Sequence, residues 1–106
     1  MNEDVFLNLT QRIRDFSQER DWEQFHSPKN LAMAITGEAG ELASEFQWLT
    51  AEESELKALS PDKLESIRLE IADVQIYLLR IAEMLEIDIP KAILDKLAIN
   101  EERFKI

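Results

Sequence analysis

Two short stretches of this 106-residue sequence each carry a pair of carboxylates three residues apart. Glu38 and Glu41 form the first pair, and Glu70 and Asp73 form the second. Residues three apart on a helix lie on one face, a turn above each other. Two such helices packed side by side would bring four carboxylates together. That arrangement suits the binding of hard divalent cations, and we predict that these four residues are metal ligands and catalytic groups.

The four carboxylates would repel one another strongly without a cation. Two like charges about 5 Å apart at an effective dielectric constant of about 20 repel by roughly 3 kcal/mol. Several such pairs rival the whole stability of a small domain, so some groups would have to bind protons unless they bind metal. A solvated acidic face is the alternative interpretation, because exposed acids are common on helices.

The candidate ligands are all oxygen atoms, which favours Mg²⁺, Mn²⁺ or Ca²⁺ over zinc or copper. Di-iron bundles need Glu-x-x-His pairs on two helices. The single histidine, His26, follows Glu23 by three residues but lies in a predicted connector, so it supplies half of such a site at most. With no cysteine and no glycine-rich phosphate loop, hydrolysis by metal-activated water is the simplest chemistry left.

The composition predicts one small all-α domain spanning residues 1–106. Two glycines and three prolines leave little room for the turns of an all-β fold, and 45% apolar residues argue against a disordered acidic chain. A formal net charge of −10 disfavours nucleic acid polymers as partners. The absence of cysteine fits a reducing cytosol, and no signal peptide or membrane span is visible, so we expect a cytoplasmic protein.

Apolar residues at helical spacing predict a bundle of four to five helices. Ser-Pro pairs mark two helix starts, and Asn2 or Asp4 is a candidate cap for the first helix. The expected main helices span Asp4–Arg20, Pro28–Leu49 and Pro61–Leu85, and a further helix starts within Ile87–Pro90. Because such helices enclose a thin core and carry apolar residues on more than one face, we expect a homodimer or homotetramer. A monomer with a wet groove is the alternative.

Two glycines lie within the predicted second helix, beside the first carboxylate pair. Each costs roughly 1 kcal/mol against alanine in a helix. Gly37 and Gly40 therefore suggest that another backbone or a ligand approaches closely there. Tolerated glycines without a role are the alternative.

These motifs resemble the signature of MazG-related all-α nucleoside triphosphate pyrophosphohydrolases, and most closely the branch that contains dCTP pyrophosphatase. The resemblance covers nearly the whole chain in order. Its residues are Arg20-Asp21-Trp22, Phe25-His26-x-Pro28-x-Asn30-Leu31, Gly37-Glu38, Gly40-Glu41-Leu42, Phe46-Gln47-Trp48, Glu70-x-x-Asp73, Ile76-Tyr77-Leu78, Lys96 and Ile99-Asn100. One departure is Gly37, where broader MazG proteins often have a second glutamate, and this leaves the number of metals and the proton acceptor open.

The resemblance implies a MazG-like fold and cleavage between the α- and β-phosphates, giving a monophosphate and pyrophosphate. It implies Mg²⁺ held by the four carboxylates, subunits that pair around the substrate pockets, and a nucleotide substrate, with dCTP or another pyrimidine deoxynucleotide favoured. The residues that it assigns to substrate binding are Trp22, His26, Asn30, Tyr77, Lys96 and Asn100.

Without the resemblance, each of these positions also has a purely structural interpretation. Trp22 suits stacking on a base but equally a plug at the bundle end, and His26 suits a connector. Tyr77 lies one turn beyond Asp73 and should sit beside the metals, although a core tyrosine is common. Lys96 and Asn100 share a helix face that would otherwise be called surface. The alternative for the whole chain is a non-catalytic helical protein-interaction module.

Overall fold

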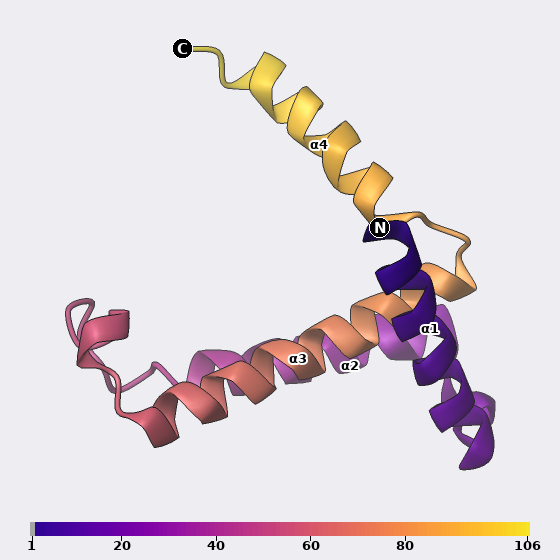
Figure 1. Ribbon diagram of the computed structural model, residues 1–106, viewed down its shortest axis with the longest axis horizontal. Helices are drawn as coiled ribbons and strands as arrows, with labels where there is room; N and C mark the ends of the chain where they lie inside the picture. Colours follow the sequence, from indigo (N-terminus) through magenta and orange to yellow (C-terminus); the bar gives the residue numbers. More distant parts are fainter. Residues whose placement is uncertain (1) are drawn as a thin grey trace.

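The computed structural model describes residues 2–106, with side chains from Val5 onward, so the predicted caps Asn2 and Asp4 lie outside the described side chains. Within residues 2–106 every regular element is a helix, and the all-α prediction is confirmed (Figure 1). The α-helices are α1 (Asn2–Glu19), α2 (Pro28–Ser44), α3 (Pro61–Met84) and α4 (Ile89–Arg103), and short 3₁₀ helices are η1 (Trp22–Phe25) and η2 (Leu56–Ala58).

Three helices start at side-chain caps. Ser27 precedes α2, Ser60 precedes α3 and Asp88 precedes α4, and each side chain accepts a hydrogen bond from the backbone N–H three residues later. A proline occupies one of the first two positions of each of these helices, where its missing N–H costs nothing. The helix starts predicted from the Ser-Pro pairs are therefore confirmed.

The predicted end of α2 at Leu49 is wrong, because the helix ends at Ser44. The hydroxyl of Ser44 donates to the carbonyl of Gly40 at 2.9 Å, a side-chain bond that competes with the helical backbone pattern. Beyond it, Thr50 and Glu53 form a capping box. Each side chain accepts from the other's backbone N–H, at 2.8 and 3.2 Å, and a new turn begins there.

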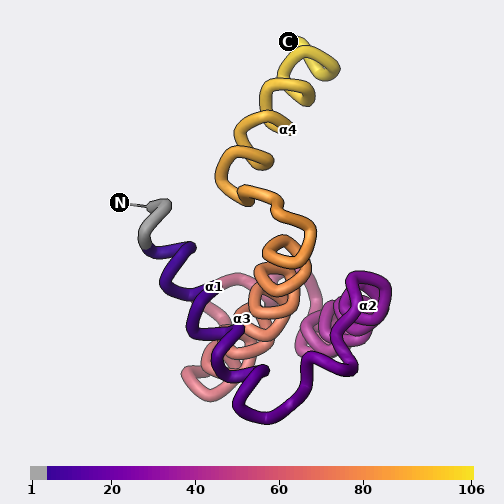
Figure 2. Tube along the Cα trace, turned by 90° about the vertical axis from the view of Figure 1, so that its right-hand side faces the viewer, coloured from indigo at the N-terminus to yellow at the C-terminus, as the bar shows by residue number. Residues whose placement is uncertain are grey.

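The antiparallel pair of α2 and α3 forms the long arm of the molecule (Figure 1). Helix α1 packs on the C-terminal part of α3, and α4 projects away from the other helices (Figures 1 and 2). The buried apolar side chains are Leu31 of α2 and Ile67, Leu79 and Ala82 of α3. The core therefore lies along α3, where the flanking helices meet it.

The single chain is open rather than compact. Its Cα radius of gyration is 16.5 Å, against roughly 13 Å for a compact domain of about 100 residues. Helix α4 contains no buried residue, although Ile93, Leu94 and Leu97 are large apolar side chains on it. None of the helices within residues 2–106 combines the length and the apolar character needed to cross a membrane.

The helix glycines have free space around them. No atom of the described chain, apart from each glycine's chain neighbours and nearby helix backbone, lies within 4 Å of a Cβ built on Gly37 or Gly40. The predicted close approach is therefore not made by any part of the chain that the structure describes. Approach by a ligand or by a second copy stays a prediction.

Candidate metal centre and adjoining cavity

The pairing of α2 with α3 brings three of the predicted ligands together. Glu38 and Glu41 come from α2 and Glu70 from α3, and one carboxylate oxygen from each lies within 4.8 Å of the others. The three-residue spacing places both α2 acids on the face that α3 contacts. The structure thus forms an all-oxygen cluster where the sequence places the first three candidates.

Asp73, the fourth candidate, lies outside that 4.8 Å group, but its negative charge still affects the pKa values of Glu38 and Glu70. Burial, followed by the charges of Glu41 and Asp73, raises the pKa of Glu38 above its usual value. Burial, followed by the charges of Glu41 and Asp73, also raises the pKa of Glu70. The charge of Glu45 raises it further. Glu38 and Glu70 therefore hold protons more tightly than isolated glutamates do.

The cluster fits a hard divalent cation. One oxygen of Glu70, Oε2, is buried and finds no hydrogen-bond partner among the described residues. A buried polar atom normally has a partner, and a cation between the carboxylates would provide one. It would also offset the like-charge repulsion that, after burial, contributes to the two raised pKa values.

Glu45, one turn beyond Glu41, has its own basic partner. Its Oε1 lies 3.1 Å from Nζ of Lys63, in the first turn of α3. Both side chains are partly exposed, so the pair contributes little to stability. Glu45 is therefore a neighbour of the cluster whose charge Lys63 partly offsets.

A cavity of about 670 Å³ adjoins the cluster, between α1, η1 and α3. Asp73 lines this cavity, and its charge raises the pKa values of Glu38 and Glu70, so Asp73 lies near both the cavity and the cluster. The cavity lies within the range of roughly 300–1,000 Å³ typical of small-molecule sites. Three of the predicted substrate residues line it, namely Trp22, His26 and Tyr77.

The two residues from the connector differ in their surroundings. Trp22 packs edge-on against Phe16 with ring centroids 5.4 Å apart, and 43% of Trp22 is exposed. The Nδ1 atom of His26 is buried with no hydrogen-bond partner among the described residues. Burial first, and then the positive charge of Arg80, lower the pKa of His26. His26 is therefore mainly neutral near pH 7.

The other predicted substrate residues do not line this cavity in the single chain. The side-chain amide of Asn30 donates to the carbonyl of Phe25 at 3.1 Å and so ties η1 to α2. Lys96 and Asn100 lie on α4, which projects away (Figure 1). Their roles in substrate binding stay predictions.

Arg80 is the cavity residue that sequence reasoning missed. It is only 6% exposed and lines the cavity from α3. Arg80 lies within the apolar run Tyr77–Ala82 of the sequence, and a charged residue in such a run indicates a buried arginine with acidic partners, because arginine is rarely buried unless it is paired.

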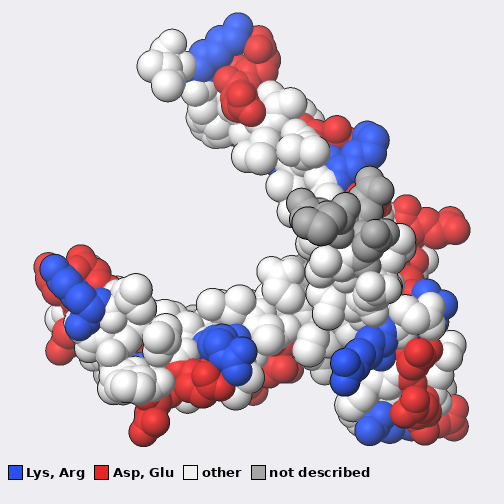
Figure 3. All heavy atoms as spheres, viewed as in Figure 1, with Lys and Arg blue, Asp and Glu red and all other residues white. Residues whose placement is uncertain are grey.

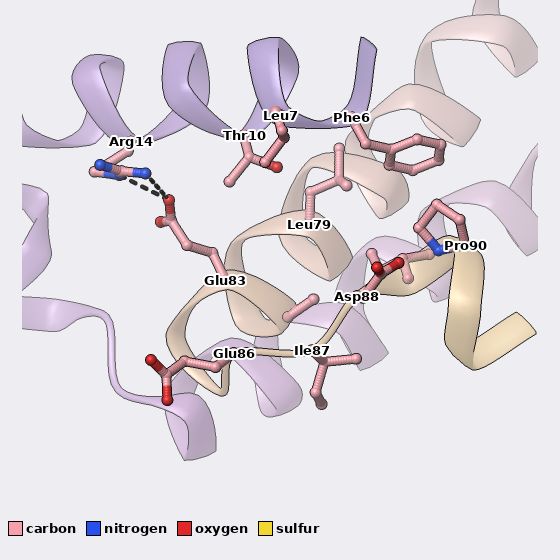
Figure 4. Close-up of a pocket in the computed structure, with 12 residues that line it drawn as sticks. Phe6, Leu7, Thr10, Arg14, Leu79, Glu83, Glu86, Ile87, Asp88 and Pro90 are labelled. Carbon is pink, nitrogen blue, oxygen red and sulfur yellow. Dashed lines mark hydrogen bonds and ion pairs between the residues drawn. The ribbon is translucent and has the colours of Figure 1, made fainter. Parts of the chain in front are cut away.

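A second cavity, of about 400 Å³, lies between α1, the end of α3 and the start of α4 (Figure 4).

Fold and site together define a class: an all-helical protein with a carboxylate cluster suited to a divalent cation beside a ligand-sized, partly aromatic cavity. No family model matches the chain. It is 44% identical over 92 residues to dCTP pyrophosphatase 1 of Bos taurus and 46% identical over 90 residues to that of Homo sapiens. These matches cover 87% and 85% of the chain, and 54% and 53% of the relatives.

A crystal structure of a pyrophosphatase from Archaeoglobus fulgidus matches at a TM-score of 0.84 and 35% identity, covering 93% of this chain and 91% of that one. The chain therefore belongs to the MazG-related all-α pyrophosphohydrolase family, in the dCTP pyrophosphatase branch. It spans about half the length of the curated relatives that it matches.

Proposed function

We propose that the chain hydrolyses deoxynucleoside triphosphates to the monophosphate and pyrophosphate, and that dCTP or another pyrimidine deoxynucleotide is preferred. The observation that carries this proposal is that Asp73 lines a ligand-sized cavity while its charge acts on the neighbouring carboxylate cluster. The names of its relatives, dCTP pyrophosphatase 1 and a pyrophosphatase, point to the same reaction.

The proposed substrate lies with its base in the aromatic part of the cavity and its phosphates toward the cluster. The indole face of Trp22 suits stacking on a base. Tyr77 lies one helical turn after Asp73, so it lies between base and phosphates. His26, mainly neutral, offers hydrogen bonds without adding charge.

Mg²⁺ is the proposed cation, held by Glu38, Glu41, Glu70 and Asp73. When bound, it would neutralise phosphate oxygens and lower the pKa of water at the site. With that cation bound, the carboxylates could hold a triphosphate that their own negative charge would otherwise repel. Mn²⁺ has similar ligand preferences and is expected to substitute.

The charge of the chain makes nucleotide binding depend on the cation. The formal net charge is −10, and acidic side chains appear on every visible arm of the molecule (Figure 3). A free triphosphate is repelled by such a surface. Tight nucleotide binding is therefore expected only with the divalent cation present.

A second copy of the chain is the proposed partner of α4. The exposed apolar residues of α4 and the open shape of the single chain support it. A homodimer or homotetramer would bury these side chains and bring Lys96 and Asn100 to the cavity of another copy. The proposal explains why these two residues lie far from the cavity of their own chain.

Product analysis tests the proposed reaction. Each deoxynucleoside triphosphate is incubated with the protein and Mg²⁺, and again with a chelator, and the products are separated. We expect pyrophosphate and monophosphate, only with Mg²⁺, and most rapidly from a pyrimidine substrate. Orthophosphate would mean attack at the terminal phosphate. No turnover on any nucleotide would favour a non-catalytic interaction module.

A further inference from the structure

The turn that carries Trp22 is held in place without a core of its own. Helix η1 (Trp22–Phe25) contains no buried residue, and Phe25 is 62% exposed. Its local bonds, from Gln24 to the carbonyl of Asp21 and from Asn30 to that of Phe25, join it to its sequence neighbours only. Trp22 itself packs on Phe16 of α1, so a further contact is needed to fix the position of the turn against α3.

A chain of four alternating charges supplies that contact. Arg80 Nη2 donates to Glu23 Oε1 of η1 at 2.6 Å, and Arg80 Nη1 donates to Glu83 Oε1 at 2.5 Å. Arg14 of α1 closes the chain, with Nε 2.7 Å from Glu83 Oε2. Figure 4 shows Arg14 and Glu83 meeting across the gap between α1 and α3.

The burial of the network indicates that its ion pairs position side chains more than they stabilise the fold. The Arg80 side chain is 7% exposed and that of Glu83 is 17% exposed, whereas Glu23 is 42% exposed. A buried ion pair loses much of its attraction to the cost of desolvation, so it is weak support for stability. A guanidinium fixed by two carboxylates, however, fixes the carboxylates in turn, because its donors form a rigid fork.

We propose that Glu23 and Arg80 are positioning residues for the nucleotide cavity: their ion pair holds the Trp22 turn against α3 and so fixes the wall on which the base stacks. The inference deepens the proposed function and rests on it. Arg80 lines the same cavity as Trp22 and His26, so the ion pair acts where the base would lie. Glu83 and Arg14 extend the network to α1.

The test uses Glu23→Gln in the whole chain, because Glu23 is partly exposed and its loss spares the core. Glu65→Gln is the matched control, since it breaks the exposed ion pair with Arg68 on α3. Both are made in a Trp48→Phe background, which leaves Trp22 as the single tryptophan and serves as the reference. The readouts are KM and kcat for dCTP, the Mg²⁺ dependence, and acrylamide quenching of Trp22 fluorescence.

We expect Glu23→Gln to raise KM by about tenfold, the order expected when one charge-assisted hydrogen bond is lost. We expect kcat and the Mg²⁺ dependence to stay within about threefold, since the carboxylate cluster is untouched, and Trp22 to become more easily quenched. Glu65→Gln should match the reference. Arg14→Gln, at the far end of the network, should shift KM and quenching in the same direction by less.

Values for Glu23→Gln that match those of Glu65→Gln, in both KM and quenching, would overturn the inference. A fall in kcat alone, with KM and quenching unchanged, would overturn it too. If the reference protein turns over no nucleotide, the proposed function fails, and the quenching comparison alone then decides whether the ion pair holds the turn.

Discussion

As proposed metal ligands, the carboxylates of Glu38 and Glu70 would bind protons and cations in competition. Burial and neighbouring charges raise both pKa values, so in the metal-free chain their contribution to stability falls as the pH rises through those values. Mg²⁺ removes the repulsion at high pH but must displace protons at low pH. We predict that Mg²⁺ raises the melting temperature more at pH 7.5 than at pH 5, measured by thermal unfolding. A gain that is larger at pH 5 would contradict this.

Removing one ligand charge tests the cluster directly. We predict that Glu70→Gln abolishes the Mg²⁺-dependent rise in melting temperature and lowers hydrolysis by at least about 100-fold, because it removes a direct ligand. The metal-free variant should be at least as stable as the wild type, since repulsion is relieved. Glu65→Gln on the same helix is the control. A Glu70→Gln variant that keeps the Mg²⁺ response would exclude Glu70 as a ligand.

His26 is the single histidine of the chain, so its imidazole can be titrated without overlapping signals from other histidines. Burial and the charge of Arg80 lower the pKa of His26, whereas Glu23 raises it. We predict that the His26 ring protons titrate below pH 6.5 in proton NMR, and that Glu23→Gln lowers the midpoint further because one raising charge is lost. An upward shift in that variant would contradict the arrangement of charges described around His26.

Helix starts are the most predictable elements of this chain, because each depends on a few adjacent residues. Ser27-Pro28 and Ser60-Pro61 specify a cap and a first turn locally. The end of α2 was missed although Thr50 and Glu53 have the spacing of a capping box. The capping box lies beyond Leu49, and the helical apolar spacing of Leu42, Phe46 and Leu49 extends past the actual helix end at Ser44.

The cap of α3 also sets the position of two candidate ligands. Ser60 accepts from the backbone N–H of Lys63 at 3.1 Å at the start of the helix that carries Glu70 and Asp73. We predict that Ser60→Ala lowers the free energy of unfolding by about 1 kcal/mol in urea denaturation. Ser66→Ala, at an exposed mid-helix position, is the control and should be neutral or slightly stabilising. Equal losses in both variants would contradict a specific capping role for Ser60.

At the scale of the molecule, the sequence predicts neighbours along a helix better than partners between helices. The meeting of Glu38 and Glu41 with Glu70 followed from helical spacing and the pairing of two helices. The network through Arg80 did not, because Glu23 lies 57 residues from Arg80 and Arg14 lies 69 residues from Glu83. Such pairs depend on how α1, η1 and α3 cross, which local patterns leave open.

The exposed apolar face of α4 predicts self-association. Sedimentation equilibrium should give a mass of at least twice the 12.3 kDa of the chain. We predict that a variant with both Leu94→Glu and Leu97→Glu loses the larger species, because charges replace apolar contacts. Glu102→Gln, which disturbs only the exposed pair with Lys105, should leave it intact. A wild-type monomer at high concentration would contradict the prediction.

The most direct measurement is the yield of pyrophosphate from dCTP with the wild-type chain, Glu70→Gln and Glu65→Gln, each in Mg²⁺ and in chelator. We predict one pyrophosphate for each monophosphate from the wild type and from Glu65→Gln in Mg²⁺. Chelator should abolish both products, and Glu70→Gln should lower both by at least about 100-fold. Pyrophosphate release that survives in chelator, or that stays near the wild-type rate in Glu70→Gln, would contradict a reaction that depends on the carboxylate cluster.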